Sequence, residues 1–96
     1  MNREEALAQL RAHTDEIKRF RVESLGLFGS VARDEAGPDS DLDLIVEFEG
    51  PATYDRYIGL KMLLEDLLGC RVDLVTSRAI KPRMRPSIER DTVRVA

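Results

Sequence analysis

The chain has 96 residues, a formal net charge of −3 and a single cysteine. This length fits one small domain over residues 1–96, and no apolar run is long enough to span a membrane. One cysteine excludes an internal disulfide, so we expect a cytoplasmic protein with neither a disulfide framework nor a structural zinc site.

The first third of the chain predicts a helix, a strand and a short second helix. Asn2 followed by Glu5 matches a helix-capping box, and apolar residues at helical spacing extend this helix to about Phe20. The apolar run 22–28 predicts a strand. Residues 30–33 can form the first turn of a short helix.

The middle of the chain predicts a loop over residues 35–40 and a strand over residues 41–48. A helix over residues 54–68 follows, with Thr53 as its N-cap and Gly69 as its C-terminal stop. This helix carries an apolar stripe that we expect to be buried, formed by Tyr57, Leu60, Leu64, Leu67 and Leu68.

The last part of the chain predicts a strand over residues 71–76, a short helix near 86–90 and an extended piece over 92–95. Taken in order, these elements alternate between helix and strand. The predicted fold class is therefore α/β (α+β), with a small mixed β-sheet and helices packed mainly on one face.

Basic residues gather at the C-terminus. Residues 77–96 hold six of the fifteen Lys and Arg residues but only two of the eighteen Asp and Glu residues. This basic tail is either a solvated face or a surface for a triphosphate or an acidic partner.

Two aspartates, Asp41 and Asp43, lie one residue apart at the start of the second predicted strand. Because side chains alternate along a strand, both point to one side while Leu42 and Leu44 point to the other. Two carboxylates a few ångströms apart repel each other by roughly 4 kcal/mol at an effective dielectric constant of about 20. A proton, a basic side chain or a metal ion must offset this repulsion.

Asp73 is a third candidate, because it alternates with apolar neighbours on the third predicted strand. If that strand lies beside the second, Asp73 joins Asp41 and Asp43 on one face. Oxygen-only ligands suit Mg²⁺, and two such ions can hold both the attacking and the leaving oxygen of a nucleotidyl transfer. Taken singly, Asp41 could instead cap a strand and Asp73 could pair with Arg71.

A Gly-Ser turn, Gly29-Ser30, follows the first predicted strand. Gly29 has no Cβ and lets the backbone approach a ligand closely, and Ser30 offers a hydroxyl and an N–H at a helix N-terminus, where anions are favoured. Arg33, one turn further on, could reach a phosphate or pair with a nearby acid. These three residues are the predicted nucleotide-binding residues.

The spacing of these motifs resembles the signature of the polymerase-beta-like nucleotidyltransferase superfamily. Gly29-Ser30 is followed by ten residues and then by Asp41-Leu42-Asp43. The segments 29–33, 40–44 and 72–75 resemble, more narrowly, the minimal nucleotidyltransferases. Asp34 departs from that pattern, which has a glycine after the Ala-Arg pair.

The resemblance implies an enzyme that transfers AMP from ATP to a protein hydroxyl with Mg²⁺. Many members of this group are antitoxins that modify a tyrosine of a HEPN-domain toxin, so it also implies a hetero-oligomer with such a partner. It implies no membrane and no direct nucleic-acid binding. By this resemblance Asp41, Asp43 and Asp73 are the metal and catalytic carboxylates, and Gly29 and Ser30 hold the triphosphate.

Two other functions stay open. The chain could be a non-catalytic binding module that neutralises a partner by masking its surface, although a pure binder has no need to hold repelling carboxylates together. Transfer to a small molecule is a further alternative, but enzymes of that kind usually carry an added acceptor-binding domain, and we expect no such domain in these 96 residues.

Overall fold

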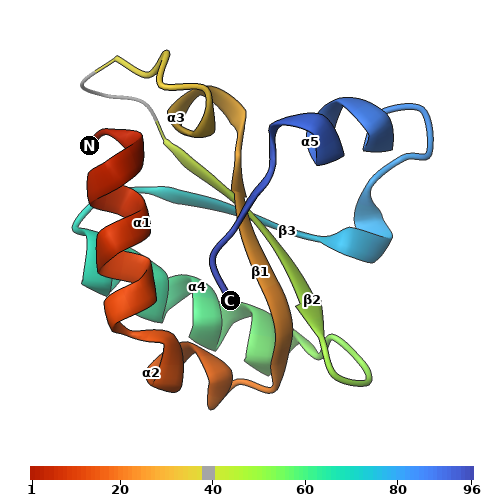
Figure 1. The fold of residues 1–96 in the computed structure, drawn as a ribbon. Helices are drawn as coiled ribbons and strands as arrows, with labels where there is room; N and C mark the ends of the chain where they lie inside the picture. The colour runs from red at the N-terminus through yellow and green to blue at the C-terminus, as the bar shows by residue number, and fades with distance from the viewer. Residues whose placement is uncertain (38–40) are drawn as a thin grey trace.

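The computed structural model describes residues 1–37 and 41–96, so the end of the predicted loop, residues 38–40, lies outside the described residues. Among the described residues, one four-stranded sheet has the order β3-β2-β1-β4 (Figure 1). Its strands are β1 (Val22–Phe28), β2 (Leu42–Phe48), β3 (Val72–Thr76) and β4 (Val93–Arg94). β1 is antiparallel to β2 and β4, whereas β2 and β3 are parallel. The predicted mixed sheet is confirmed.

Helices cover the two faces of this sheet unequally. α1 (Arg3–Ala12), α2 (Thr14–Lys18) and α4 (Tyr54–Leu68) pack together on one face (Figure 1). The opposite face is covered only in part, by the short 3-10 helix η1 (Ser77–Ala79) and by α5 (Arg85–Asp91). α3 (Gly29–Ala32) directly follows β1 at one end of the sheet. The fold therefore leaves one sheet face accessible beside α3 and α5.

The hydrophobic core lies between the sheet and the three-helix face. Alternate residues of β2 point into it, so that Leu42, Leu44 and Val46 are at most 1% exposed. The other large, fully buried side chains come from α1, α2, β1, α3 and α4: Leu10, Ile17, Leu25, Leu27, Val31, Leu60 and Leu64. The residues between those of β2, including Asp43, necessarily face the less covered side.

The first helix is interrupted, contrary to the prediction that it runs unbroken to about Phe20. Asn2 caps it as expected, since its side chain accepts a hydrogen bond from the Glu5 N–H at 2.9 Å. The chain then bends at His13, where the Thr14 hydroxyl donates to the Arg11 carbonyl at 2.9 Å. A hydroxyl that bonds the preceding turn competes with the helical backbone pattern and explains the break.

α4 begins and ends where the sequence predicts. The Thr53 side chain accepts from the Arg56 N–H, and Gly69 takes the left-handed conformation with φ of 65°. Leu60, Leu64 and Leu68 are buried as expected, and Tyr57 is half-buried but packs against the core. Leu67 is only half-buried. Its inclusion in the buried stripe was wrong, because the helix packs on a narrower face than the full set of leucines covers.

Contacts from α4 fix the position of β3. The Glu65 carboxylate accepts from the Val72 N–H at 3.1 Å, and the Tyr57 hydroxyl donates to the Leu74 carbonyl. At the start of the strand pair, the Leu42 N–H donates to the Arg71 carbonyl at 3.0 Å. The two bonds from α4 hold β3, and the Leu42–Arg71 bond belongs to the parallel register that places Asp43 opposite Asp73.

The basic tail forms η1, α5 and β4, close to the predicted short helix and final extended piece. α5 buries none of its residues fully, and its side-chain hydrogen bonds join Asp91 to Arg33 and Arg85 to the Ser77 carbonyl. None of the helices within residues 1–37 and 41–96 is long and apolar enough to cross a membrane.

Candidate active site

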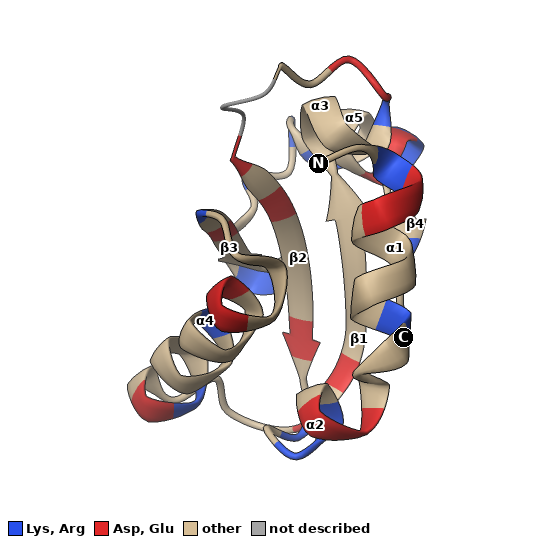
Figure 2. Ribbon diagram, turned by 90° about the vertical axis from the view of Figure 1, so that its left-hand side faces the viewer, with Lys and Arg blue, Asp and Glu red and all other residues tan. Residues whose placement is uncertain are grey.

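Asp43 and Asp73 lie side by side on neighbouring strands. They are register partners in the parallel pair of β2 and β3, and both point away from the hydrophobic core. Asp43 is half-buried and Asp73 is exposed. The expectation that the third strand lies beside the second is thus confirmed, and two of the three predicted carboxylates meet on one face. Figure 2 shows acidic residues at the start of β2, at the end of the sheet where α3 lies.

The environment of Asp43 opposes its negative charge. Burial raises the pKa of the Asp43 carboxyl, and repulsion by Asp73 together with a hydrogen bond between the two carboxyls raises this pKa further. Asp41 adds a smaller repulsion, whereas the positive charge of Arg33 lowers the pKa of Asp43. The net effect is that the pKa of Asp43 lies above its ordinary value. A bound cation would stabilise the charged form of this carboxyl.

Asp41 lies just before β2 and is exposed. Its charge reaches Asp43, but within residues 1–37 and 41–96 no three Asp, Glu, His or Cys side chains stand close enough to hold a metal ion by themselves. The structure therefore brings together Asp43 and Asp73 and leaves Asp41 at the edge of the pair. Such a partial site suits Mg²⁺, which usually takes one or two carboxylates and completes its shell with water and phosphate oxygens.

Gly29 lies directly under the carboxylate of Asp43. A Cβ on Gly29 would overlap Asp43 Oδ2 and lie 2.9 Å from Asp43 Cγ, and the backbone of Gly29 has a φ of +76°. Both features require glycine, because other residues carry a Cβ and rarely adopt positive φ. The structure thus gives Gly29 a role that the sequence did not suggest: it makes room for the carboxylate of Asp43.

Ser30 is half-buried near the start of α3. The C-terminal end of α3 forms a Schellman motif that includes the carbonyl of Ser30. The Glu35 N–H donates to the Ser30 carbonyl at 2.9 Å, and the Asp34 N–H donates to the Val31 carbonyl at 3.0 Å. Asp34 holds the left-handed position of this motif with a φ of 59°. The departure from glycine at position 34 therefore keeps the turn that a glycine would make.

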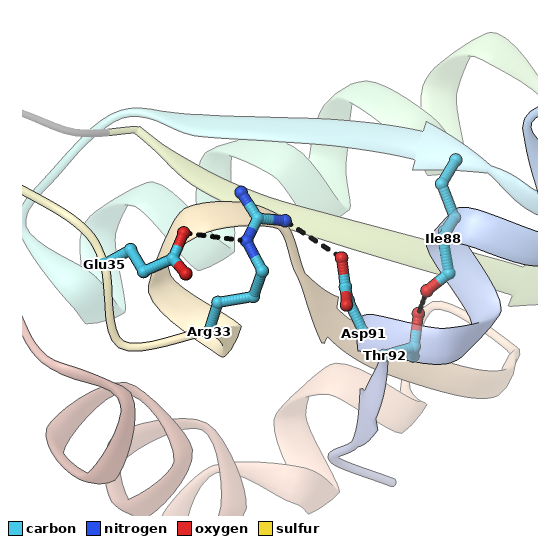
Figure 3. Close-up of polar contacts among 5 residues, drawn as sticks. All are labelled: Arg33, Glu35, Ile88, Asp91 and Thr92. Carbon is cyan, nitrogen blue, oxygen red and sulfur yellow. Dashed lines mark hydrogen bonds and ion pairs between the residues drawn. The ribbon is translucent and has the colours of Figure 1, made fainter.

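Arg33 is held by two carboxylates (Figure 3). Its Nε lies 3.1 Å from Glu35 Oε2, and its Nη1 lies 2.9 Å from Asp91 Oδ2. Glu35 belongs to the loop after α3, whereas Asp91 is the last residue of α5. Sequence reasoning allowed a nearby acid for Arg33 but missed Asp91, since no local pattern links residues that lie 58 positions apart.

The raised pKa of Asp43 predicts a pH-dependent effect of Asp43→Asn on stability. Folding raises this pKa, so the stability that its proton provides is full at acid pH and is lost as the pH rises through the pKa of folded Asp43. Asn stays neutral at every pH, so the variant does not lose this contribution to stability as the pH rises. We expect the free energy of unfolding of the variant, relative to the native chain, to increase between about pH 4 and pH 7. Urea denaturation with EDTA at both pH values tests this, and a difference that stays constant or shrinks contradicts it.

Comparisons with known proteins show the family to which the chain belongs. A family model described as the nucleotidyltransferase domain matches residues 10–95. The protein adenylyltransferase MntA of Thermococcus cleftensis is 42% identical over 93 residues, covering 96% of this chain and 94% of that protein. The solved structure of a candidate minimal nucleotidyltransferase is 42% identical, with a TM-score of 0.85 over 97% of this chain and 95% of that chain.

A more distant structure shares the fold. It is a complex of a tri-AMPylated HEPN toxin with an MNT antitoxin from Shewanella oneidensis, and one of its chains matches with a TM-score of 0.67 at 17% identity. The match covers 94% of this chain and 71% of that chain. At this identity the similarity shows the fold alone.

The mixed sheet and the family match over residues 10–95 define a nucleotidyltransferase, and the chain belongs to the nucleotidyltransferase domain family. Within that family it is a minimal nucleotidyltransferase, in the same group as the protein adenylyltransferase MntA.

Proposed function

We propose that this chain transfers AMP from ATP to a hydroxyl group of a partner protein, in a reaction that depends on Mg²⁺. The acceptor we propose is a tyrosine of a HEPN-type toxin, which makes this chain the antitoxin of the pair, bound to it as a hetero-oligomer in the cytoplasm. The observation that carries the proposal is the pairing of Asp43 with Asp73 on the open sheet face, beside Gly29 and α3.

The chemistry of the carboxylate pair supports a Mg²⁺ site. All the donors are oxygens, and the environment of Asp43 opposes its charge in a way that a nearby cation reverses. Asp43, Asp73 and Asp41 are the residues that would hold the ion. When bound, Mg²⁺ supplies positive charge at the phosphates and aligns the attacking and leaving groups.

The residues of the chain then bind the phosphates and accept the proton of the acceptor hydroxyl. Gly29 and Ser30, at the start of α3, bind the β- and γ-phosphates through backbone N–H groups and the serine hydroxyl. The acceptor oxygen attacks the α-phosphorus, the new O–P bond forms as the bond to the β-phosphate oxygen breaks, and pyrophosphate leaves. Asp73, the more exposed of the paired carboxylates, accepts the proton of the acceptor hydroxyl. Catalysis of this kind depends mainly on positioning and charge neutralisation.

The names of the relatives support a protein as the acceptor and a HEPN-type toxin as the partner. One relative that shares 42% of its residues over the matched region is named a protein adenylyltransferase, and the more distant complex contains a toxin that carries AMP groups. The exposed basic residues Arg78, Lys81 and Arg83 lie just after β3, and we propose that they steer an acidic surface of the partner. Arg85 is engaged differently, because it donates to the Ser77 carbonyl at 2.9 Å.

Binding of Mg²⁺ and ATP tests the nucleotide site without a partner. We expect Mg·ATP to raise the free energy of unfolding by about 2.7 kcal/mol at one hundred times its dissociation constant. ATP with EDTA should give a much smaller gain, because the carboxylate pair then repels the phosphates. A thermal-shift titration measures both, and equal shifts with and without Mg²⁺ contradict a metal–nucleotide site.

A further inference from the structure

The guanidinium of Arg33 is held by two carboxylates, but not all of its N–H donors form hydrogen bonds to them. It has five N–H donors, of which Glu35 and Asp91 each engage one. Its third nitrogen, Nη2, has no hydrogen bond to either carboxylate (Figure 3). Arg33 also lies near enough to Asp43 for its charge to act on that carboxyl. Arg33 therefore has unused N–H donors within electrostatic reach of Asp43, and guanidinium N–H donors suit a phosphate oxygen.

Of the two carboxylates that hold Arg33, Asp91 is the less exposed. The side chain of Asp91 is 29% exposed, whereas that of Glu35 is 65% exposed. Thr92, the residue after Asp91, packs closely against the backbone of Gly26 in β1. The packing is so close that a Cβ on Gly26 would lie only 2.5 Å from the Thr92 methyl group. The Thr92 hydroxyl also donates to the Ile88 carbonyl at 2.6 Å (Figure 3). The end of α5 thus packs against β1, and this packing gives the Asp91 carboxylate a defined position.

We propose that Asp91 is a positioning residue for the nucleotide: from the end of α5 it holds Arg33, before any ligand arrives, where the guanidinium can bind the β- or γ-phosphate of ATP. This inference rests on the proposed function and extends the nucleotide site to the C-terminal helix. The physical basis is preorganisation. A long side chain that is already ordered loses little freedom when the ligand binds, whereas a free arginine must be ordered at that moment.

The test measures binding of a non-hydrolysable ATP analogue with Mg²⁺ to the full chain by isothermal titration calorimetry. We expect Asp91→Ala to raise the dissociation constant by about three- to tenfold, the loss expected when one long side chain is no longer preordered. Asp91→Asn, which keeps the shape and one acceptor oxygen, should give a smaller increase and serves if the Ala variant folds poorly. Glu89→Ala is the matched control, because it removes an exposed carboxylate from the same helix and should bind as the native chain does.

The double variant separates positioning from a general effect on α5. If Asp91 acts through Arg33, Asp91→Ala should weaken binding no further in a chain that already carries Arg33→Ala. The inference is overturned if Asp91→Ala binds like the native chain, if it binds more tightly, or if its effect persists without Arg33. Failure of the native chain to bind the analogue at all would overturn the proposed function as well, so the two failures are distinguishable.

Discussion

Asp43→Asn is expected to lower the rate of AMP transfer on the order of a hundred- to a thousandfold, the range seen when one preorganised electrostatic group is removed from an active site. Asn keeps the shape of the side chain but loses the charge that binds the cation. The fold should be retained, because Asp43 lies outside the hydrophobic core and the raised pKa shows that its charge opposes folding. Asp73→Asn should reduce the rate similarly, since Asp73 is the register partner of Asp43.

Incorporation of labelled AMP and the melting temperature of each variant measure these effects. Glu47→Gln is the matched control, because Glu47 is an exposed carboxylate on the same strand and the same face as Asp43. It should transfer AMP at close to the native rate. Activity of Asp43→Asn within threefold of the native chain contradicts the assignment of this carboxylate.

Gly29→Ala is expected to have the second largest effect, and it should lower both stability and activity. The positive φ at position 29 strains any residue with a Cβ, at about 1–2 kcal/mol. The added methyl group also occupies the place of the Asp43 carboxylate and must displace it. A displacement of about 1 Å in a catalytic group can lower the rate by roughly a hundredfold.

Gly50→Ala separates these two causes. Gly50 has a φ of +75°, close to that of Gly29, but a Cβ there meets nothing within 4 Å. Gly50→Ala should therefore lower the free energy of unfolding by a similar amount while leaving AMP transfer nearly unchanged. If Gly29→Ala and Gly50→Ala have equal effects on the rate, the contact between position 29 and Asp43 has no part in catalysis.

The parts of the fold that could be predicted are those with local signals. α4 was predicted with its correct ends because Thr53 and Gly69 act on the adjoining turns alone. β1 was predicted over its full length, 22–28, from one apolar run. The break at His13 was missed because it arises from a hydroxyl of Thr14 that bonds to the turn before it, and helical spacing does not report this.

The candidate site was predictable to the extent that it follows from strand periodicity. Alternation along β2 and β3 placed Asp43 and Asp73 on the outer face, but their meeting depended on strand order, which the sequence left conditional. The contact between Arg33 and Asp91 could not be predicted, because it joins residues 58 positions apart through the path of α5. The overlap of Gly29 with Asp43 likewise depends on the way β1 and β2 pair.

The most direct test of the account is a transfer assay with ATP labelled at the α-phosphate, the purified chain and its HEPN-type partner. The account predicts that label moves to the partner with release of pyrophosphate in the presence of Mg²⁺, that EDTA abolishes this transfer, and that Asp43→Asn lowers its rate at least about a hundredfold. A partner that binds the chain and is neutralised by it, yet never acquires label, would contradict the account and identify the chain as a non-catalytic binding module.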